Sequence, residues 1–209
     1  MANDSGWYER RVLPWLLDFA CGLAPIAKRR QAVVPLAAGR VLEIGIGTGL
    51  NLRHYDRSRL VSLTGIDPAE QLHALAQRRS RRYGVDVELR ALSAEQLPFD
   101  ADSFDCVVCT YTLCTVPDPA AALAEMRRVL SPGGRLLFAE HGLAPDANVA
   151  RWQRRLEPAW SRLAGGCHLS RDVPRLLLEA GFLAPAMHKG YIAWPRTLAY
   201  NFWGEARVV

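Results

Sequence analysis

The sequence contains no apolar run of the roughly 18 to 20 residues that a membrane-spanning helix needs. The nearest approach, residues 12–27, is interrupted by Pro14, Asp18 and Pro25. It also lacks the basic start, the clean apolar stretch and the small-residue cleavage site of a signal peptide. These absences predict a cytoplasmic protein whose contact with a membrane is at most peripheral.

The chain has an odd number of cysteines, five, so they cannot all pair with one another. Cys106 and Cys109 have the C-x-x-C spacing of a chelating or redox pair, but they lie in an apolar, strand-like run. Residues three apart on a strand point to opposite faces, and no second pair completes a zinc site. We therefore expect reduced thiols and no metal site.

No internal repeat, low-complexity tract or linker divides the 209 residues, which predicts a single domain. The 26 basic and 21 acidic residues give a formal net charge of +5. Much of the excess lies in residues 28–30 and 78–82, which we interpret as solvated helix faces. The charge mildly favours anionic ligands, but it does not predict a nucleic-acid partner.

Strand-like and helix-like segments alternate through most of the chain. The strands are expected at residues 40–44, 63–67, 85–92, 104–112 and 135–140, with two more near 185–192 and 198–203. The helices are expected at residues 7–21, 26–36, 68–83, 119–130, 149–163 and 171–180. This order predicts an α/β fold with a doubly wound, seven-stranded, mostly parallel sheet. Residues 1–38 are expected to form N-terminal lid helices over a core of residues 39–209.

A glycine-rich turn follows the first predicted strand, within residues 41–51. Gly45, Gly47 and Gly49 form the pattern G-x-G-x-G, which differs from both the dinucleotide fingerprint and the phosphate-binding P-loop. Glycines without Cβ atoms let the backbone turn sharply and approach a ligand closely. The turn therefore indicates a ligand at the carboxyl end of this strand.

Three further segments stand at the ends of the next strands. Asp67, followed by Pro68, ends the second strand, where a carboxylate can accept hydrogen bonds from ribose hydroxyls. Residues 92–99 follow the third strand, and Thr110 lies near the end of the fourth. Together with the glycine turn, these three segments predict a nucleoside-containing ligand bound along one edge of the sheet.

From Arg40 to His141, these segments resemble the class I S-adenosylmethionine-dependent methyltransferases. The resemblance implies a Rossmann-like fold and S-adenosylmethionine as the cofactor. It implies that Glu43 and the glycines surround the methionine part, Asp67 binds ribose, and Thr110 flanks the sulfonium. Ser93 and Ala94 would lie by the adenine, although the family often has Asp at the position of Ser93. The full set of predicted cofactor-binding residues is Tyr8, Glu43, Gly45, Gly47, Gly49, Asn51, Asp67, Pro68, Ser93, Ala94, Glu95 and Thr110.

The methyl acceptor is expected beside the ends of the fourth and fifth strands. Thr112, Cys114 and His141 are the predicted catalytic residues there. His141 is the first candidate for a base, because imidazole accepts a proton near neutral pH. Its alternative role is to shape the pocket. Glu140 is a candidate to orient His141, and His168 is either a lid residue or an exposed loop residue.

A narrower resemblance extends from Arg40 to Phe182. The segments 110–116, 127–134, 140–141, 152–160 and 166–171 are similar to the alkyl thiol methyltransferases of animals. The resemblance implies a small, largely apolar thiol as the acceptor. A weaker resemblance to bacterial phosphatidylethanolamine N-methyltransferases keeps a phospholipid, or another N- or O-methyl acceptor, as the alternative.

Two further classes of function stay open. One is a non-catalytic cofactor-binding scaffold on the same fold, which the intact glycines and Asp67 disfavour. The other is a nucleic-acid methyltransferase, but the chain has neither the Asn-Pro-Pro-aromatic motif nor the catalytic cysteine motif of those enzymes.

Overall fold

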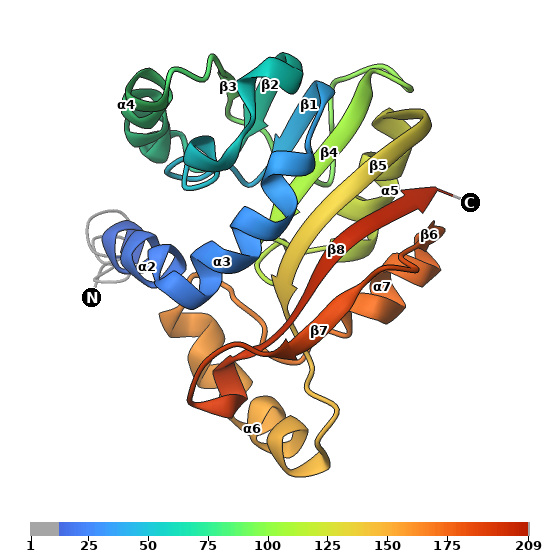
Figure 1. The fold of residues 1–209 in the computed structure, drawn as a ribbon. Coiled ribbons are helices and arrows are strands. Elements are labelled where there is room, and N and C mark those ends of the chain that lie inside the picture. The colour runs from blue at the N-terminus through green and yellow to red at the C-terminus, as the bar shows by residue number, and fades with distance from the viewer. Residues whose placement is uncertain (1–12, 209) are drawn as a thin grey trace, which may run out of the picture.

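Apolar strands bounded by glycine and proline turns assemble into one sheet with helices on both faces (Figure 1). The computed structural model describes residues 13–208. The strands are β1 (Gly39–Ile44), β2 (Leu60–Ile66), β3 (Glu88–Arg90), β4 (Phe104–Thr110), β5 (Leu130–His141), β6 (Phe182–Leu183), β7 (His188–Tyr191) and β8 (Tyr200–Val208). The α-helices are α2 (Leu13–Gly22), α3 (Ala24–Val33), α4 (His73–Tyr83), α5 (Pro119–Val129), α6 (Ala147–Leu163) and α7 (Val173–Glu179). Short 3-10 turns are η1 (Val34–Leu36), η2 (Leu52–His54), η3 (Arg57–Arg59), η4 (Glu70–Leu72) and η5 (Arg196–Leu198).

The sheet has the order β3-β2-β1-β4-β5-β8-β6, and β7 pairs with β8. Strands β1 to β5 are parallel, whereas β8 runs antiparallel to β5, β6 and β7. The chain order reverses where β1 lies beside β4, and ligands of such sheets bind outside the carboxyl ends at this point. The mostly parallel, doubly wound sheet predicted from the sequence is confirmed.

Several element bounds differ from the prediction, among them β3, which spans only Glu88–Arg90, and β8, which extends to Val208. Within residues 13–208 the sheet has eight strands rather than seven, because the short β6 pairs with the end of β8. Strand β5 begins at Leu130 instead of residue 135, because Leu130 already pairs with Phe104. Helix α4 begins at His73, because residues 70–72 form the tighter turn η4.

Helices pack on both faces of the sheet. Helix α3 packs against β5 and β8 on one face, and α5 and α7 pack together on the other (Figure 1). Cys106 lies in the core beneath α3, whereas Cys109 lies in the core beneath α5. The two thiols therefore point to opposite faces, as their spacing on the strand predicts.

No helix within residues 13–208 is long and apolar enough to cross a membrane. Helix α2 nevertheless presents Trp15, Leu16 and Phe19 to solvent, with Phe19 72% exposed. This helix lies beside the carboxyl edge of the sheet (Figure 1), where it lines a cavity.

Candidate active site

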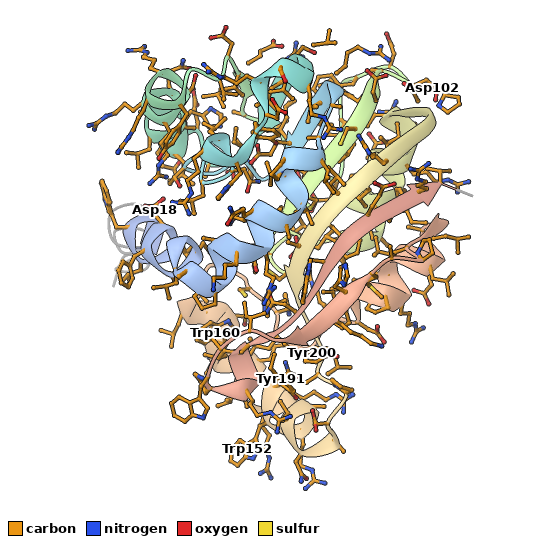
Figure 2. All side chains as sticks on the ribbon, viewed as in Figure 1. Asp18, Asp102, Trp152, Trp160, Tyr191 and Tyr200 are labelled. Carbon is orange, nitrogen blue, oxygen red and sulfur yellow. The ribbon has the colours of Figure 1, made fainter. Side chains whose placement is uncertain are left out.

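A cavity of about 490 Å³ lies at the carboxyl ends of β1, β2 and β4. Its walls come from the glycine turn, from the segments that follow β2, β3, β4 and β5, from α2 and α3, and from the loop after α6. Figure 2 labels Asp18 on α2 and Trp160 on α6, and both side chains contribute to the walls. A second hollow of about 840 Å³, lined by α5, α7 and residues 130–133, contains none of the predicted site residues.

The glycine turn forms the wall at the end of β1. Gly45 and Gly47 line the cavity and have φ angles of +68° and +51°. A Cβ atom on Gly45 would collide with the side chain of Thr112. A Cβ atom on Gly47 would have no neighbour closer than 3.7 Å, the carboxylate of Asp67. Because these glycines have no side chains, the backbone of the turn is uncovered on the cavity side. A ligand can therefore approach it closely.

Asp67 connects the glycine turn to the end of β2. One carboxylate oxygen accepts a hydrogen bond from the backbone N–H of Gly47 at 3.0 Å, and the other accepts from the N–H of Ala69 at 2.8 Å. Burial raises the pKa of Asp67, while the two backbone bonds oppose that rise. Asp67, Pro68 and Ala69 all line the cavity.

A buried polar network stands behind the cavity wall. The amide of Asn51 donates to Glu43 and to the hydroxyl of Thr110, each at 2.9 Å. Tyr55 donates to the other oxygen of Glu43 at 2.7 Å. Burial raises the pKa of Glu43 to about 7, although Tyr55 and the charge of Arg30 lower it. Glu43 and Asn51 therefore support Thr110 from behind instead of lining the cavity.

Arg30 of α3 completes this network and was not predicted from the sequence. Its guanidinium donates to Asn51 at 2.9 Å and to Thr110, and it lies 5.0 Å from the ring centre of Tyr111. Arg30 is only 6% exposed, lines the cavity, and has an Nε atom with no hydrogen-bond partner. A buried cation with an unused donor favours an anionic group nearby.

An ion pair ties the N-terminal helix α2 to α4 beside the glycine turn. Asp18 of α2 accepts from Arg79 of α4 at 2.7 Å and from the hydroxyl of Thr48. The bond from Arg79 lowers the pKa of Asp18 more than burial raises it. Helices α2 and α3 contribute wall residues, namely Leu17, Asp18, Ala20, Cys21, Ile26 and Arg30. Tyr8, a predicted lid residue, lies outside the described residues.

The segment after β3 forms another wall, as predicted. Ser93, Ala94 and Glu95 line the cavity. The hydroxyl of Ser93 donates to one oxygen of Glu95, and the other oxygen accepts from the N–H of Asp118 at 3.3 Å. Glu95 therefore anchors this segment to the start of α5.

The loop after β4 bends sharply towards the cavity. Tyr111 has a φ angle of +54°, which non-glycine residues rarely adopt and which marks functional sites when neighbours enforce it. Here the hydroxyl of Tyr111 donates to Asn201 at 2.8 Å. Thr112 lines the cavity, but its hydroxyl lies 3.2 Å from the carbonyl oxygens of Ile44 and Thr110 and donates to these backbone groups.

Glu140 holds the same loop from β5. One oxygen accepts from the N–H groups of Thr112 at 2.7 Å and Leu113 at 3.0 Å. The other oxygen is buried without a partner, and burial raises the pKa of Glu140 to about 7. Glu140 thus fixes the loop that carries Thr112.

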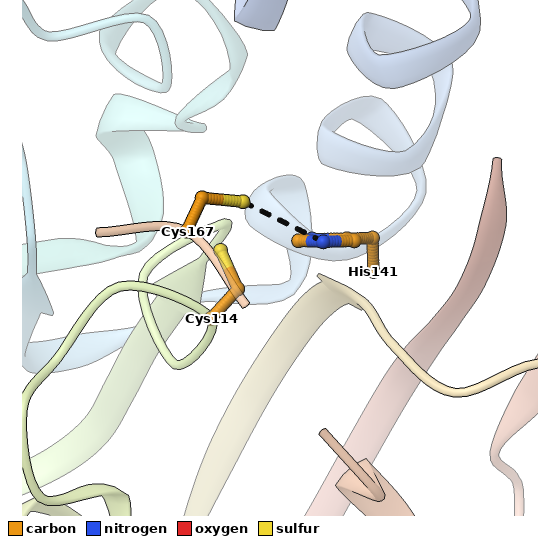
Figure 3. A group of neighbouring side chains, drawn as sticks. All are labelled: Cys114, His141 and Cys167. Carbon is orange, nitrogen blue, oxygen red and sulfur yellow. Dashed lines mark hydrogen bonds between the residues drawn. The ribbon is translucent and has the colours of Figure 1, made fainter. Parts of the chain in front are cut away.

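Cys114, His141 and Cys167 meet at the far end of the cavity (Figure 3). The Sγ atom of Cys167 lies 3.6 Å from Nε2 of His141. The bond from Cys114 lowers the pKa of Cys167 despite burial, and His141 lowers it further. Burial lowers the pKa of His141, but Cys167 and Glu140 raise it above its ordinary value. The base role of His141 stays a prediction.

The loop after α6 brings Cys167 to this cluster. Its neighbour His168 turns away from the cavity, with its Nδ1 atom 3.3 Å from Glu157. Glu157 also accepts from the N–H of Ser170 at 2.7 Å, which ties the loop to α6. Sequence reasoning chose His168 in this loop, but Cys167 is the residue that reaches the cavity.

The structure thus gathers most of the predicted residues around one cavity. Those that line it are Gly45, Gly47, Asp67, Pro68, Ser93, Ala94, Glu95, Thr110, Thr112, Cys114 and His141. Three predicted residues do not line it: Glu43, Gly49 and Asn51. Gly49 instead lets the turn pack against Ala76 of α4, where a Cβ atom would lie 3.1 Å from the backbone.

Comparison with known proteins identifies the same region. Residues 42–138 match a family model described as a methyltransferase domain. The chain is 38% identical over 149 residues to thiol S-methyltransferase TMT1B of Rattus norvegicus, a match that covers 68% of this chain and 59% of that protein. It is 36% identical over 153 residues to phosphatidylethanolamine N-methyltransferase of Cereibacter sphaeroides, covering 71% and 74%.

A solved structure supports the fold assignment. The methyltransferase CalH in complex with SAH superposes with a TM-score of 0.64 at 27% identity, covering 94% of this chain and 59% of that chain. This chain spans about three fifths of the length of TMT1B. The fold is the Rossmann-like methyltransferase fold, and the chain belongs to the S-adenosylmethionine-dependent methyltransferase family.

Proposed function

We propose that this protein transfers a methyl group from S-adenosylmethionine to the sulfur of a small, largely apolar thiol. The observation that carries the proposal is one cavity with two chemically different ends. The glycine turn and Asp67 form one end, and Cys114, His141 and Cys167 form the other. The 38% identity to a thiol S-methyltransferase supports the choice of sulfur as the acceptor atom.

The residues at the first end fit S-adenosylmethionine. A cavity of about 490 Å³ lies within the range of about 300 to 1,000 Å³ typical of small-molecule sites. The bare backbone of Gly47 allows close approach of a ligand, and the oxygens of Asp67 retain lone pairs for ribose hydroxyls. Arg30, a buried cation that lines the cavity, is suited to the carboxylate of the cofactor's methionine part.

The second end suits a thiol with an apolar body. Its walls include Trp160, Leu169, Ile192 and Leu198 besides the cysteines and His141. When bound, S-adenosylmethionine supplies an activated methyl group on its sulfonium. The protein has to position the acceptor sulfur and lower the cost of its thiolate, whose free-thiol pKa is about 8.5. His141 is the predicted proton acceptor and is buried within this end of the cavity.

A second candidate function is methylation of a lipid amine at a membrane surface. The exposed Trp15, Leu16 and Phe19 of α2 favour it, because apolar and aromatic side chains on one helix can enter a lipid interface. The 36% identity to a phosphatidylethanolamine N-methyltransferase points the same way. This candidate needs an acceptor site open to the membrane, whereas the thiol proposal needs only the cavity.

The test is methyl transfer from isotopically labelled S-adenosylmethionine to a panel of matched acceptors, read by mass. The panel holds an alkanethiol, a thiophenol, a phenol, an alkylamine and vesicles of phosphatidylethanolamine. The thiol proposal predicts labelled thioethers as the main products. Labelled lipid with no thioether would favour the second candidate, and label in the phenol or alkylamine alone would reject both.

A further inference from the structure

Three potential metal-ligand side chains converge from distant parts of the chain. Cys114 follows β4, His141 ends β5, and Cys167 follows α6 (Figure 3). Their ligand atoms all lie within 4.8 Å of one another, and this is the only such cluster found within residues 13–208. Cys114 and His141 are buried, and Cys167 is partly buried. All three side chains line the cavity, so a ligand can reach them.

The spacing fits a tetrahedral zinc site. With Zn–S near 2.3 Å and Zn–N near 2.0 to 2.1 Å, a tetrahedral angle puts the sulfur and nitrogen about 3.6 Å apart. The observed distance from Sγ of Cys167 to Nε2 of His141 is 3.6 Å. Two thiolates, one neutral imidazole and a divalent cation sum to zero charge, so the loaded group adds no net charge to a buried wall.

The backbone around these residues is already fixed. The N–H of His168 donates to the carbonyl of Cys114 at 2.8 Å, which joins the two cysteine loops. Arg171 donates to the carbonyl of Leu113 and, at 2.7 Å, to that of Val116. A cluster held by such bonds needs little rearrangement to accept a cation, which is the condition for a selective site.

We propose that Cys114, His141 and Cys167 bind a thiophilic divalent cation, with Zn²⁺ as the reference ion. Three protein ligands leave the fourth tetrahedral position for a small molecule, as in catalytic rather than structural zinc sites. The cavity lies on the side of that position, because all three ligands contribute to its wall.

The open position gives the site a role that rests on the proposed function. An acceptor thiol replaces the water on the cation, a metal–sulfur bond forms, and the S–H proton passes to solvent. Coordination to the cation deprotonates a thiol outright. In the protein with the cation bound, His141 is a metal ligand, and the cation instead of His141 promotes deprotonation of the acceptor thiol.

The site is tested by metal content. Wild-type protein purified with a phosphine reductant is equilibrated with Zn²⁺, desalted and analysed by mass spectrometry of the elements. The matched control is Cys106→Ala, which removes a buried thiol of β4 outside the cavity. We expect one bound zinc per chain in the wild type and the control. We expect Cys114→Ser and Cys167→Ser to lose affinity by more than about tenfold.

Cobalt substitution provides a second measurement that is independent of activity. Bound Co²⁺ should give thiolate-to-metal charge-transfer absorption in the wild type. Each ligand variant should weaken this absorption, and an added alkanethiol should alter it. Circular dichroism verifies that the variants fold. No bound metal in the folded wild type, or equal binding by all variants, overturns the proposal. A Cys114–Cys167 disulfide whose reduction restores no metal uptake also overturns it.

The two proposals fail separately. Bound metal without thioether formation rejects the thiol acceptor and leaves the metal site standing. Thioether formation by a folded wild type that binds no metal rejects the metal site and leaves thiol methylation standing.

Discussion

The carboxylate of Asp67 accepts a hydrogen bond from the backbone N–H of Gly47, twenty residues earlier in the chain, at 3.0 Å. This bond joins the turn after β1 to the end of β2 in the wall of the cavity. Because each carboxylate oxygen has two lone pairs, Asp67 can bind the turn and a ribose at the same time. The same side chain therefore shapes the site and contacts the cofactor in this account.

Replacing Asp67 by alanine should weaken cofactor binding. Hydrogen bonds to a charged group contribute about 1.5 to 3 kcal/mol, so we expect the affinity for S-adenosylhomocysteine to fall about 10- to 100-fold. Isothermal calorimetry measures the change. Asp56→Ala is the control, because Asp56 caps η3 away from the cavity. Equal affinity in Asp67→Ala and the control would remove Asp67 from the site.

Gly47→Ala should separate binding from stability. Gly47 and Gly133 have φ angles of +51° and +78°, so alanine at either position costs about 1 kcal/mol of folding free energy. A Cβ atom meets nothing within 4 Å at Gly133, but at Gly47 it enters the cavity wall. We expect similar losses of thermal stability and a loss of cofactor affinity in Gly47→Ala alone. Intact binding by Gly47→Ala would contradict the close approach of the cofactor to this backbone.

Glu43 should make the protein less stable at higher pH. Burial raises its folded-state pKa from 4.5 to about 7, so the folded state holds the proton more tightly. Its contribution favours folding below pH 4.5 and is lost as the pH rises to 7. One pKa unit corresponds to about 1.4 kcal/mol, so the loss is about 3 kcal/mol.

The Glu43→Gln variant checks this assignment, since glutamine can bond both Asn51 and Tyr55. We expect it to be about 2 to 3 kcal/mol more stable than the wild type at pH 8 and nearly equal at pH 4. Urea unfolding at both pH values provides the measurement, with the exposed Glu179→Gln as control. Part of the wild-type fall in unfolding free energy between pH 4 and pH 8 should persist in the variant, because burial also raises the pKa of Glu140 to about 7. A stability difference between Glu43→Gln and the wild type that is the same at pH 4 and pH 8 would contradict this assignment.

Asp18→Ala should loosen the N-terminal helices. Asp18 is the α2 residue that bonds Arg79 and Thr48, so its loss should cost about 1 to 2 kcal/mol locally. We expect faster amide exchange along α2 and faster dissociation of the cofactor, read by hydrogen exchange and stopped flow. Glu179→Ala breaks an exposed ion pair with Arg175 and should change neither. Unchanged exchange in α2 would show that other contacts hold the lid.

The sequence predicted those parts of the site that local chemistry determines. The glycine turn, Asp67 and residues 93–95 follow strands that apolar patterns reveal, and the parallel sheet then places them along one edge. The alternation of β4 likewise predicted that Cys106 and Cys109 face apart.

Residues that reach the cavity from distant segments were missed. Arg30 lies in a basic run that resembles a solvated helix face, yet helix packing buries it beside Asn51. Cys167 lies 53 residues after Cys114, and only the fold brings their thiols together. Tertiary proximity of this kind has no local signal in one sequence. The one sequence signal that could have indicated Cys167 is its position between the Gly165-Gly166 pair and His168.

The most direct test of the central claim compares an alkanethiol with the alcohol of the same chain length. Both acceptors fill the same apolar space, and only the reacting atom differs. Under single-turnover conditions with labelled S-adenosylmethionine, the account predicts rapid labelling of the thiol and negligible labelling of the alcohol. Equal rates for the two acceptors, or no labelled thioether from a protein that binds the cofactor, would contradict it.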